Sequence, residues 1–220
     1  MARPCIVWGS KGQSRVVFDI LCSEGSSVIH LFDNDFKAQS VLNGVPLSYG
    51  EKGLAEFVAE LKSQGKCTSE IDCIAAIGGG HGGSRVEMTC LMATYGFQPR
   101  SLVHQASVIS AHALLGQSVQ ILAGATIAPF ASIGDYSIIN SGANVDHDCR
   151  LGSACHVAPN AAIAGQVVIE DQVFVGTNAT VLPGLRIGFH SVIGAGSVVT
   201  KSLPPNSIVV GNPARPLYGD

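Results

Sequence analysis

Residues 103–204 read VHQASV ISAHAL LGQSVQ ILAGAT IAPFAS IGDYSI INSGAN VDHDCR LGSACH VAPNAA IAGQVV IEDQVF VGTNAT VLPGLR IGFHSV IGAGSV VTKSLP, seventeen groups of six without an insertion. The first residue of every group is Val, Ile or Leu, and the fifth is Ser, Ala, Val, Cys or Leu. A helix turns every ~3.6 residues and a strand alternates side chains with a period of about two, so neither produces a period of six. The repeat therefore predicts a parallel β-helix, in which each group forms one flat side and three groups close a coil.

A coil of three groups contains 18 residues, so residues 18 apart in the sequence should lie directly over one another. The large aliphatic residue of each group would fill the interior, and the small residue would fit the corner. Successive coils would stack at the spacing of β-sheet strands, about 4.8 Å.

The chain before this repeat has a different pattern, in which apolar strand segments alternate with helical ones. We expect strands in 5–9, 26–35 and 71–80, and helices in 15–25, 50–65 and 84–96. The second helix carries Leu54, Phe57, Val58 and Leu61 on one face. This alternation predicts a Rossmann-like α/β domain with a parallel sheet, spanning 1–100, followed by the β-helix domain in 101–220.

The composition excludes several classes of protein. Charged residues are only 13% and hydrophobic residues 46%, which excludes a disordered chain, and the net charge of −3 offers no basic surface for nucleic acid. The opening MARPCIVWGS has no apolar signal region, and no apolar run is long enough to span a membrane. Seven scattered cysteines without a C-x-x-C pair indicate reduced thiols, so we expect a cytoplasmic protein.

The ends of the predicted parallel strands carry candidate ligand-binding residues. The turn GSKGQS, 9–14, lacks the dinucleotide-binding pattern because Lys11 and Ser14 stand where glycines are needed. A tight turn that opens a helix can still hold a phosphate, and Asp33 and Asp35 end the next strand. A second glycine cluster follows at 78–83. The alternative is a structural turn with solvated loop acids.

The stretch NVDHDC, 144–149, places Asp146, His147 and Asp148 on outward-facing positions of the predicted coil. A solvated turn is the simplest interpretation. However, a carboxylate beside His147 could accept its Nδ1 proton and leave Nε2 as a base. The residue stacked over His147 should be Gly165, which would leave a notch beside the imidazole and a reachable backbone N–H. His156 follows half a coil later.

The remaining histidines and cysteines carry weaker signals. Cys149 and Cys155 occupy small corner positions that packing explains. His81 stays open, because it lies in the glycine cluster. The histidines expected to be ordinary surface or packing residues are His30, His104, His112 and His190.

Two further motifs extend the pattern: DHDCRLGSACHVAPNAAIAG at 146–165 and PPNSIVVGNPAR at 204–215. Together with the G-x-x-G turn of the first domain, they make the chain resemble the bacterial NeuD/PglD-type sugar acetyltransferases over essentially its whole length. The resemblance implies a left-handed β-helix and a homotrimer with acetyl-CoA in the groove between neighbouring subunits. It also implies that the first domain binds a nucleotide-linked sugar.

Carried over by position, the resemblance implies that His147 is the general base and Asp148 the acid that raises its basicity. It places His156 and the Gly165 amide around the acetyl carbonyl, with the pantetheine arm along Thr177 and Ala195. The positions that it implies for the nucleotide sugar are Lys11, Gly12, Gln13, Asp33, Asn34 and Gly78. The family often has Ser-Gly-His in place of Lys11–Gln13, and Asn residues in place of Gly79 and Gly80.

The implied reaction is transfer of an acetyl group from acetyl-CoA to the 4-amino group of a nucleotide-activated sugar, with no metal and no acyl-enzyme. UDP-4-amino-4,6-dideoxy-N-acetylglucosamine, of the bacillosamine pathway, is the favoured acceptor. GDP-perosamine and dTDP-linked amino sugars are alternatives, as is O-acetylation of sialic acid. Two other classes stay open: a zinc β-helix enzyme, which would need three converging imidazoles, and a scaffold trimer without catalysis.

Overall fold

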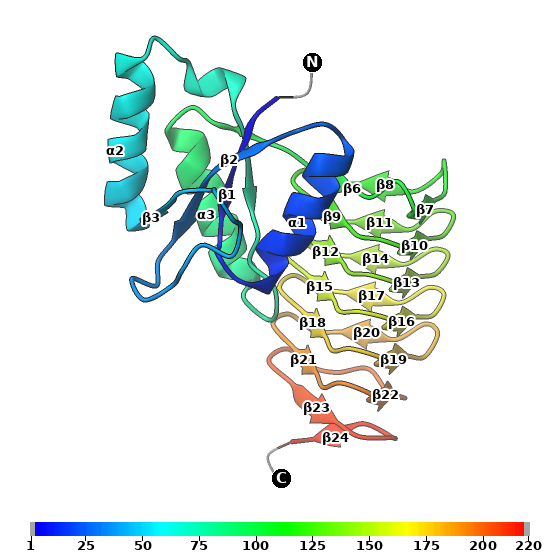
Figure 1. Ribbon diagram of the computed structural model, residues 1–220. Helices are drawn as coiled ribbons and strands as arrows, with labels where there is room; N and C mark the ends of the chain where they lie inside the picture. The colour runs from blue at the N-terminus through cyan, green and yellow to red at the C-terminus, as the bar shows by residue number, and fades with distance from the viewer. Residues whose placement is uncertain (1–2, 218–220) are drawn as a thin grey trace. The chain divides into compact units, whose positions relative to one another are not determined.

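The computed structural model describes residues 3–217 and divides the chain into two compact units (Figure 1). The first unit comprises the chain up to Ile77 and again from Ser84 to Leu102. The second comprises the short segment Gly78–Gly83 and the chain from Val103 onward. The sequence pattern did not anticipate that this glycine segment would belong with the second unit.

The first unit is built on a parallel sheet with the strand order β3-β2-β1-β4-β5. The parallel sheet confirms the predicted fold class. Two of its strands were not predicted, because neither LSY nor QP has an apolar run of useful length. The strands are β1 (Cys5–Trp8), β2 (Val28–Asp33), β3 (Leu47–Tyr49), β4 (Asp72–Ala75) and β5 (Gln98–Pro99).

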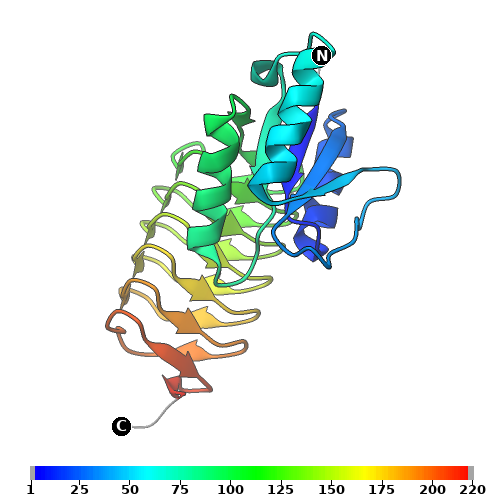
Figure 2. The same cartoon turned by 90° about the vertical axis from the view of Figure 1, so that its left-hand side faces the viewer.

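Three α-helices cover this sheet: α1 (Gly12–Ser23), α2 (Gly50–Ser63) and α3 (Gly82–Thr94), with a short 3-10 turn at Thr68–Glu70. Leu54, Val58 and Leu61 of α2 share one buried cluster with Met88 and Met92 of α3. The two helices therefore pack on the same face of the sheet, and α1 lies on the opposite face (Figure 2). None of the helices within residues 3–217 is long and apolar enough to cross a membrane.

The second unit is the predicted left-handed β-helix. Its two-residue strands form three parallel sheets, which are the sides of the coil. Strand pairs such as Asn144↔Ala162 and His156↔Phe174 show the 18-residue coil. The first side contains β7 (Val108–Ile109), β10 (Thr126–Ile127), β13 (Asn144–Val145), β16 (Ala162–Ile163), β19 (Thr180–Val181) and β22 (Val198–Val199).

The second side contains β8 (Leu114–Leu115), β11 (Ser132–Ile133), β14 (Arg150–Leu151), β17 (Val168–Ile169) and β20 (Arg186–Ile187). The third contains β6 (Leu102–Val103), β9 (Gln120–Ile121), β12 (Ile138–Ile139), β15 (His156–Val157), β18 (Phe174–Val175), β21 (Val192–Ile193), β23 (Ile208–Val210) and β24 (Arg215–Pro216). Figure 1 shows these strands as stacked arrows.

The interior of the coil is filled as the repeat predicted. Most first and fifth residues of the groups form one buried cluster, which includes Val145, Cys149 and Cys155, whereas Val103 and Leu115 near the start of the coil are exposed. The turns between the sides also repeat. The fourth residue of each group from Ser118 to Gly196 has a positive φ, between +53° and +64° at the non-glycine positions up to His190. The corners of the coil therefore use left-handed residues.

The carboxyl-terminal end of the β-helix is closed by extended chain. β23 continues the third side with a 16-residue step, Val192↔Ile208, and β24 pairs antiparallel with β23. The second side ends in a bridge between Ile187 and Leu203. On the first side, the N–H of Ala214 donates to the carbonyl of Val198. The last strand of each side thus has a hydrogen-bonded neighbour beyond it.

Candidate active site

The corner between β13 and β14 carries the Asp-His-Asp run. Nδ1 of His147 lies 2.8 Å from Oδ2 of Asp148, and the N–H of His147 donates to Oδ1 of Asp146 at 2.7 Å. The two acids therefore differ in role: Asp148 contacts the imidazole, and Asp146 contacts the backbone. Because a carboxylate can only accept, Nδ1 carries the proton and Nε2 is the free basic nitrogen.

Both acids act on the titration of this imidazole. The hydrogen bond to Asp148, and then the negative charge of Asp146, raise the pKa of His147 above its ordinary value. The side chain is 53% exposed, so a substrate can reach it. Asp148 itself has a φ of +58°, the left-handed conformation shared by the corners from Ser118 to Gly196, which Asp and Asn tolerate better than most residues.

Gly165 lies directly under the ring of His147, as the 18-residue coil predicted. A Cβ at this position would lie 2.6 Å from Nε2 and 2.7 Å from Cε1 of His147. The expected open notch is therefore corrected: the imidazole itself fills the space left by the missing side chain, and Gly165 is buried. Within residues 3–217, the N–H of Gly165 makes no hydrogen bond, so it is still available as a donor.

His156 lies on β15, on a different side of the coil, and is only 5% exposed. Its Nδ1 lies 3.2 Å from the carbonyl of Gly79, and its Nε2 lies 3.0 Å from Nδ2 of Asn140. Its ring also meets Phe174 edge-on, with centroids 5.4 Å apart. The structure thus gives both nitrogens of His156 protein partners, which the sequence did not reveal.

Thr177 and Ala195 occupy a further corner of the coil. Both are exposed and stand 18 residues apart, in the turns after β18 and β21. The N–H of Gly196 donates to the carbonyl of Thr177 at 2.8 Å, which ties the two coils at this point. Because His147 lies in the turn between the first and second sides, one copy of the chain does not bring these residues to its own His147.

In the first unit, Asp33 ties together the carboxyl ends of β1 and β2. Its Oδ2 accepts from the N–H of Ser10 at 2.9 Å and from the Ser10 hydroxyl at 2.7 Å. Its Oδ1 accepts from the N–H of Asp35 at 2.9 Å. Both carboxylate oxygens are thus engaged within the protein. Sequence reasoning assigned Asp33 to the ligand and missed Ser10, which is buried.

The neighbouring polar groups remain at the surface of this sheet edge. Lys11, the N-cap of α1, pairs with Asp35 at 3.5 Å, and the Lys11 side chain is 74% exposed. Gly12 and Gln13 open the helix, and a Cβ on Gly12 would meet nothing within 4 Å. Asn34 is exposed and contacts the Met88 sulfur at 3.7 Å. Gly78, by contrast, belongs to the second unit.

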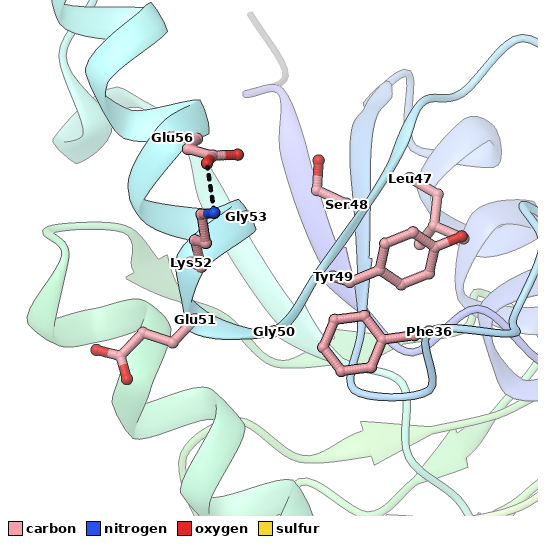
Figure 3. A pocket seen from close by; sticks show the side chains of 9 residues that line it. All are labelled: Phe36, Leu47, Ser48, Tyr49, Gly50, Glu51, Lys52, Gly53 and Glu56. Carbon is pink, nitrogen blue, oxygen red and sulfur yellow. Dashed lines mark ion pairs between the residues drawn. The ribbon is translucent and has the colours of Figure 1, made fainter.

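A cavity of about 480 Å³ opens at the carboxyl end of β3, beside the first turn of α2 (Figure 3). The rings of Phe36 and Tyr49 stand together at one wall, with centroids 5.7 Å apart, and Phe36 is 76% exposed. The opposite wall carries Lys52 and Glu56, an ion pair of 3.9 Å. Sequence reasoning missed this aromatic pocket. The signal was Phe36, an aromatic residue directly after the polar run Asp33–Asp35.

The histidines expected to be packing or surface residues have contacts of that kind. Burial lowers the pKa of His30, whose Nε2 meets the Ser48 hydroxyl at 2.9 Å, consistent with a packing residue. His112 and His190 stack on neighbouring Phe rings, and Nδ1 of His104 accepts from a turn N–H. In the described part of the chain, no three His, Cys, Asp or Glu side chains gather as a metal site requires.

Known proteins share both the sequence and the architecture of this chain. The sequence profile of the hexapeptide repeat of succinyl-transferase matches residues 166–201. A solved structure of a perosamine N-acetyltransferase variant from Caulobacter crescentus, in complex with CoA and GDP-perosamine, is 34% identical with a TM-score of 0.85. That comparison covers 99% of this chain and 97% of the other. The acetyltransferase domain of PglB from Neisseria gonorrhoeae FA1090, in complex with acetyl coenzyme A, is 28% identical with a TM-score of 0.83 and covers 99% and 100%.

Curated relatives match only part of the chain. A putative acetyltransferase of Schizosaccharomyces pombe is 44% identical over 91 residues, which are 38% of this chain and 44% of that protein. An acyl-[acyl-carrier-protein]–UDP-N-acetylglucosamine O-acyltransferase of Burkholderia thailandensis is 38% identical over 89 residues, 40% of this chain and 34% of that protein. The chain thus spans less than half the length of the curated relatives that it matches.

Proposed function

The chain belongs to the NeuD/PglD-type sugar acetyltransferases of the hexapeptide-repeat class, and on this premise we propose that it transfers the acetyl group of acetyl-CoA to the amino group of a nucleotide-linked amino sugar. The observation that carries the proposal is the His147–Asp148 pair over Gly165. An amine that attacks a thioester must lose a proton, and a neutral imidazole accepts one near neutral pH.

The proton transfer follows from the tautomer of His147. The neutral amine attacks the thioester carbon while Nε2 of His147 takes the proton from the amine nitrogen. The proton on Nδ1 stays hydrogen-bonded to Asp148, whose negative charge stabilises the imidazolium that forms. Collapse of the tetrahedral species breaks the carbon–sulfur bond, and the thiolate of CoA takes the proton from Nε2. General-base catalysis of this kind contributes roughly 10²–10⁴-fold.

We propose the N–H of Gly165 as a donor to the oxyanion of the tetrahedral species. The absence of an internal partner for this N–H within residues 3–217 supports the proposal. One donor of this kind typically contributes about 2.7–4 kcal/mol to transition-state stabilisation. Gly165 packs against the imidazole that takes the proton, so at this corner the glycine N–H would stabilise the oxyanion while the imidazole accepts the proton of the amine.

The carboxyl edge of the sheet in the first unit is proposed to bind the nucleotide. Lys11, at the amino end of α1, supplies a cation for a diphosphate, and the positive end of the helix dipole favours the same anion. Asp35 is the exposed acid that can accept from ribose hydroxyls, whereas Asp33 holds the turn in shape. Gly12, Gln13 and Asn34 line the same edge as proposed contacts.

The aromatic pocket of Figure 3 suits the base of that nucleotide. A volume of about 480 Å³ exceeds the size of a nucleobase, and Phe36 and Tyr49 offer flat apolar surface for stacking. Phe36 follows β2 and Tyr49 ends β3, so both rings lie at the same carboxyl edge of the parallel sheet as the proposed phosphate site. Phe36→Ala should therefore raise the KM for the nucleotide sugar several-fold and leave the KM for acetyl-CoA unchanged.

A homotrimer is proposed because one copy of the chain separates two parts of the site. His147 lies at one corner of the coil, whereas Thr177 and Ala195 lie at another. Threefold association of coils would set the corner of one copy beside a different corner of the next. Acetyl-CoA would then run along Thr177 and Ala195 of one copy and reach His147 of its neighbour.

The acceptor is proposed to be a nucleoside-diphosphate-linked 4-amino sugar. The favoured sequence-based candidate is UDP-4-amino-4,6-dideoxy-N-acetylglucosamine, while GDP-perosamine is supported by the relative that is 34% identical and was solved with it. The test is incubation of the protein with acetyl-CoA and UDP-, GDP- and dTDP-linked 4-amino sugars, followed by thiol release and mass spectrometry. Acetylation of free sialic acid, or of no sugar in the panel, would refute the proposal.

A further inference from the structure

We propose that His156 is a positioning residue that holds the Gly78–Gly83 segment on the β-helix through its Nδ1–H, and that this segment controls the binding of the nucleotide sugar. The inference rests on the proposed function for its link to the sugar. It differs from the role that the family resemblance implies for His156, which is contact with the acetyl group of acetyl-CoA.

The hydrogen bonds around His156 define its tautomer. Oδ1 of Asn140 accepts from the N–H of Ser141 at 2.8 Å, so the amide nitrogen of Asn140 faces the ring. That nitrogen can only donate, and Nε2 of His156 therefore accepts it at 3.0 Å. Nδ1 then carries the ring proton and donates to the carbonyl of Gly79 at 3.2 Å. A neutral imidazole satisfies all of these groups at once.

The glycine segment is fitted closely to the coil that carries His156. A Cβ on Gly82 would lie 2.3 Å from the carbonyl oxygen of Ala154, so only glycine allows this approach. A Cβ on Gly80 would lie 3.8 Å from Cβ of Phe174, and one on Gly83 would lie 3.4 Å from Oε1 of Gln172. Ala154 and Gln172 are left-handed corner residues on successive coils. The segment therefore packs along one corner of the β-helix.

The chain just before Gly79 is also held in place. The guanidinium of Arg85, which is only 1% exposed, donates to the carbonyl of Ile77 at 2.8 Å. The segment between Ile77 and α3 is thus anchored just before its first glycine and again at Gly79. Gly79 has a φ of +66°, and the Gly79 carbonyl that reaches His156 belongs to this left-handed residue.

The position of the segment in the chain links it to the sugar. It joins the carboxyl end of β4, a central strand of the parallel sheet, to the first turn of α3. Loops at this edge of a parallel α/β sheet are the ones that bind ligands. If Nδ1 of His156 releases Gly79, the loop loses a fixed geometry, and we expect weaker binding of the nucleotide sugar without a change in acetyl-CoA binding.

Two substitutions distinguish the two nitrogens of His156. The amide nitrogen of Asn lies about where Nδ1 lies in histidine, so His156→Asn keeps a donor for Gly79 and loses the partner of Asn140. Gln reaches about as far as Nε2, so His156→Gln keeps a polar partner for Asn140 and loses the donor to Gly79. His156→Phe keeps the ring beside Phe174 and loses both nitrogens, and it replaces His156→Gln if that variant does not fold.

The experiment measures KM for the nucleotide sugar, KM for acetyl-CoA, and hydrogen–deuterium exchange of the amides in residues 78–83. We expect His156→Asn to stay within about 3-fold of the unmodified protein in the KM for the sugar. His156→Gln and His156→Phe should raise it about 10-fold, the effect of losing one buried hydrogen bond. The loop amides should exchange faster in these two variants, and the KM for acetyl-CoA should stay unchanged. His190→Asn and His190→Gln are the controls, because His190 is an exposed turn histidine.

A larger loss in His156→Asn than in His156→Gln, or a rise in the KM for acetyl-CoA alone, would overturn the assignment to Nδ1. If the unmodified protein acetylates no nucleotide sugar, the proposed function fails but the exchange measurement still decides the contact. In that case, unchanged exchange of residues 78–83 in both His156→Gln and His156→Phe would overturn the proposal that His156 holds this segment.

Discussion

The imidazole of His147 covers Gly165 so closely that a methyl group on the glycine would lie 2.6 Å from Nε2. The contact follows from the coil length, because the two residues are one coil apart. It brings a candidate base and a free backbone donor to one corner, and it makes the glycine sensitive to the smallest substitution.

Gly165→Ala should displace the imidazole and lower kcat by about 10-fold or more, since misplacing a catalytic group by about 1 Å can cost 10²-fold. The backbone of Gly165 is not left-handed, so alanine should be compatible with the fold. A double-mutant cycle with His147→Ala checks the cause. In the His147→Ala background, Gly165→Ala should have little further effect on kcat, and additive losses would contradict the stacking argument.

His147→Asn should lower kcat by about 10²-fold or more while acetyl-CoA still binds, because the variant keeps a polar side chain but removes the base. The measurements are kcat of His147→Asn and of the unmodified protein, and the affinity of each for acetyl-CoA by calorimetry. His190→Asn is the matched control, since His190 is also an exposed corner histidine. Near-normal turnover in His147→Asn would end the general-base proposal.

Asp148→Asn should move the acidic limb of the kcat/KM profile to lower pH. Asp148 and Asp146 raise the pKa of His147, so removing the carboxylate that contacts Nδ1 lowers that pKa, and the imidazole stays neutral to lower pH. The plateau should also fall, because a weaker base accepts the proton less readily. Asparagine suits the left-handed φ of residue 148. Asp146→Asn should shift the limb in the same direction by less, and a larger shift than that of Asp148→Asn would reverse the assignment.

Asp33→Ala and Asp35→Ala should differ in their effect on stability. Asp33→Ala removes the acceptor of the buried Ser10 hydroxyl and N–H, which should lower the free energy of unfolding by about 1–3 kcal/mol and raise the KM for the sugar. Asp35→Ala removes an exposed ion pair with Lys11, so its stability should be unchanged. Thermal unfolding and the KM for the nucleotide sugar are measured for both variants. If Asp33→Ala is as stable as the unmodified protein but has a raised KM for the sugar, Asp33 contacts the ligand directly.

Mixing two inactive variants tests the shared site. His147→Asn lacks the base, and Thr177→Trp should block the proposed acetyl-CoA groove at an exposed corner residue. In mixed trimers, about a quarter of the sites would combine an intact His147 with an intact Thr177 from the neighbouring copy. Activity should therefore return on co-refolding. A mixture no more active than its parts, or a monomer in sedimentation, would refute the shared groove.

The β-helix could be predicted in detail because its contacts are periodic. The 18-residue coil fixes the neighbour of every residue, so the stacking of His147 on Gly165 follows from counting. The same frame showed that Asp146, His147 and Asp148 face outward. It could not show that the imidazole would fill the space over the glycine, since that depends on the rotamer of one side chain.

The hydrogen bond of His156 to Gly79 could not be predicted, because it involves no repeat, whereas the contact with Phe174 follows from the 18-residue coil. Gly79 lies 77 residues away in the sequence, and glycines carry no pattern of side chains that would indicate what they pack against. The hydrogen bonds of Asp33 to Ser10 were missed for a related reason: Ser10 follows a neighbouring strand and lies 23 residues away in the sequence. Strands β3 and β5 were missed because they are short and owe their pairing to the sheet around them.

The closed carboxyl-terminal end of the β-helix also bears on self-association. A stack of coils is a solenoid whose last turn would otherwise offer three rows of unpaired backbone groups to any second molecule, and such edges template end-to-end polymerisation. Leu203, β23 and Ala214 occupy those rows, one for each side of the coil. Truncation of the chain before Leu203 should therefore convert a discrete particle into one that elongates into fibrils as its concentration rises.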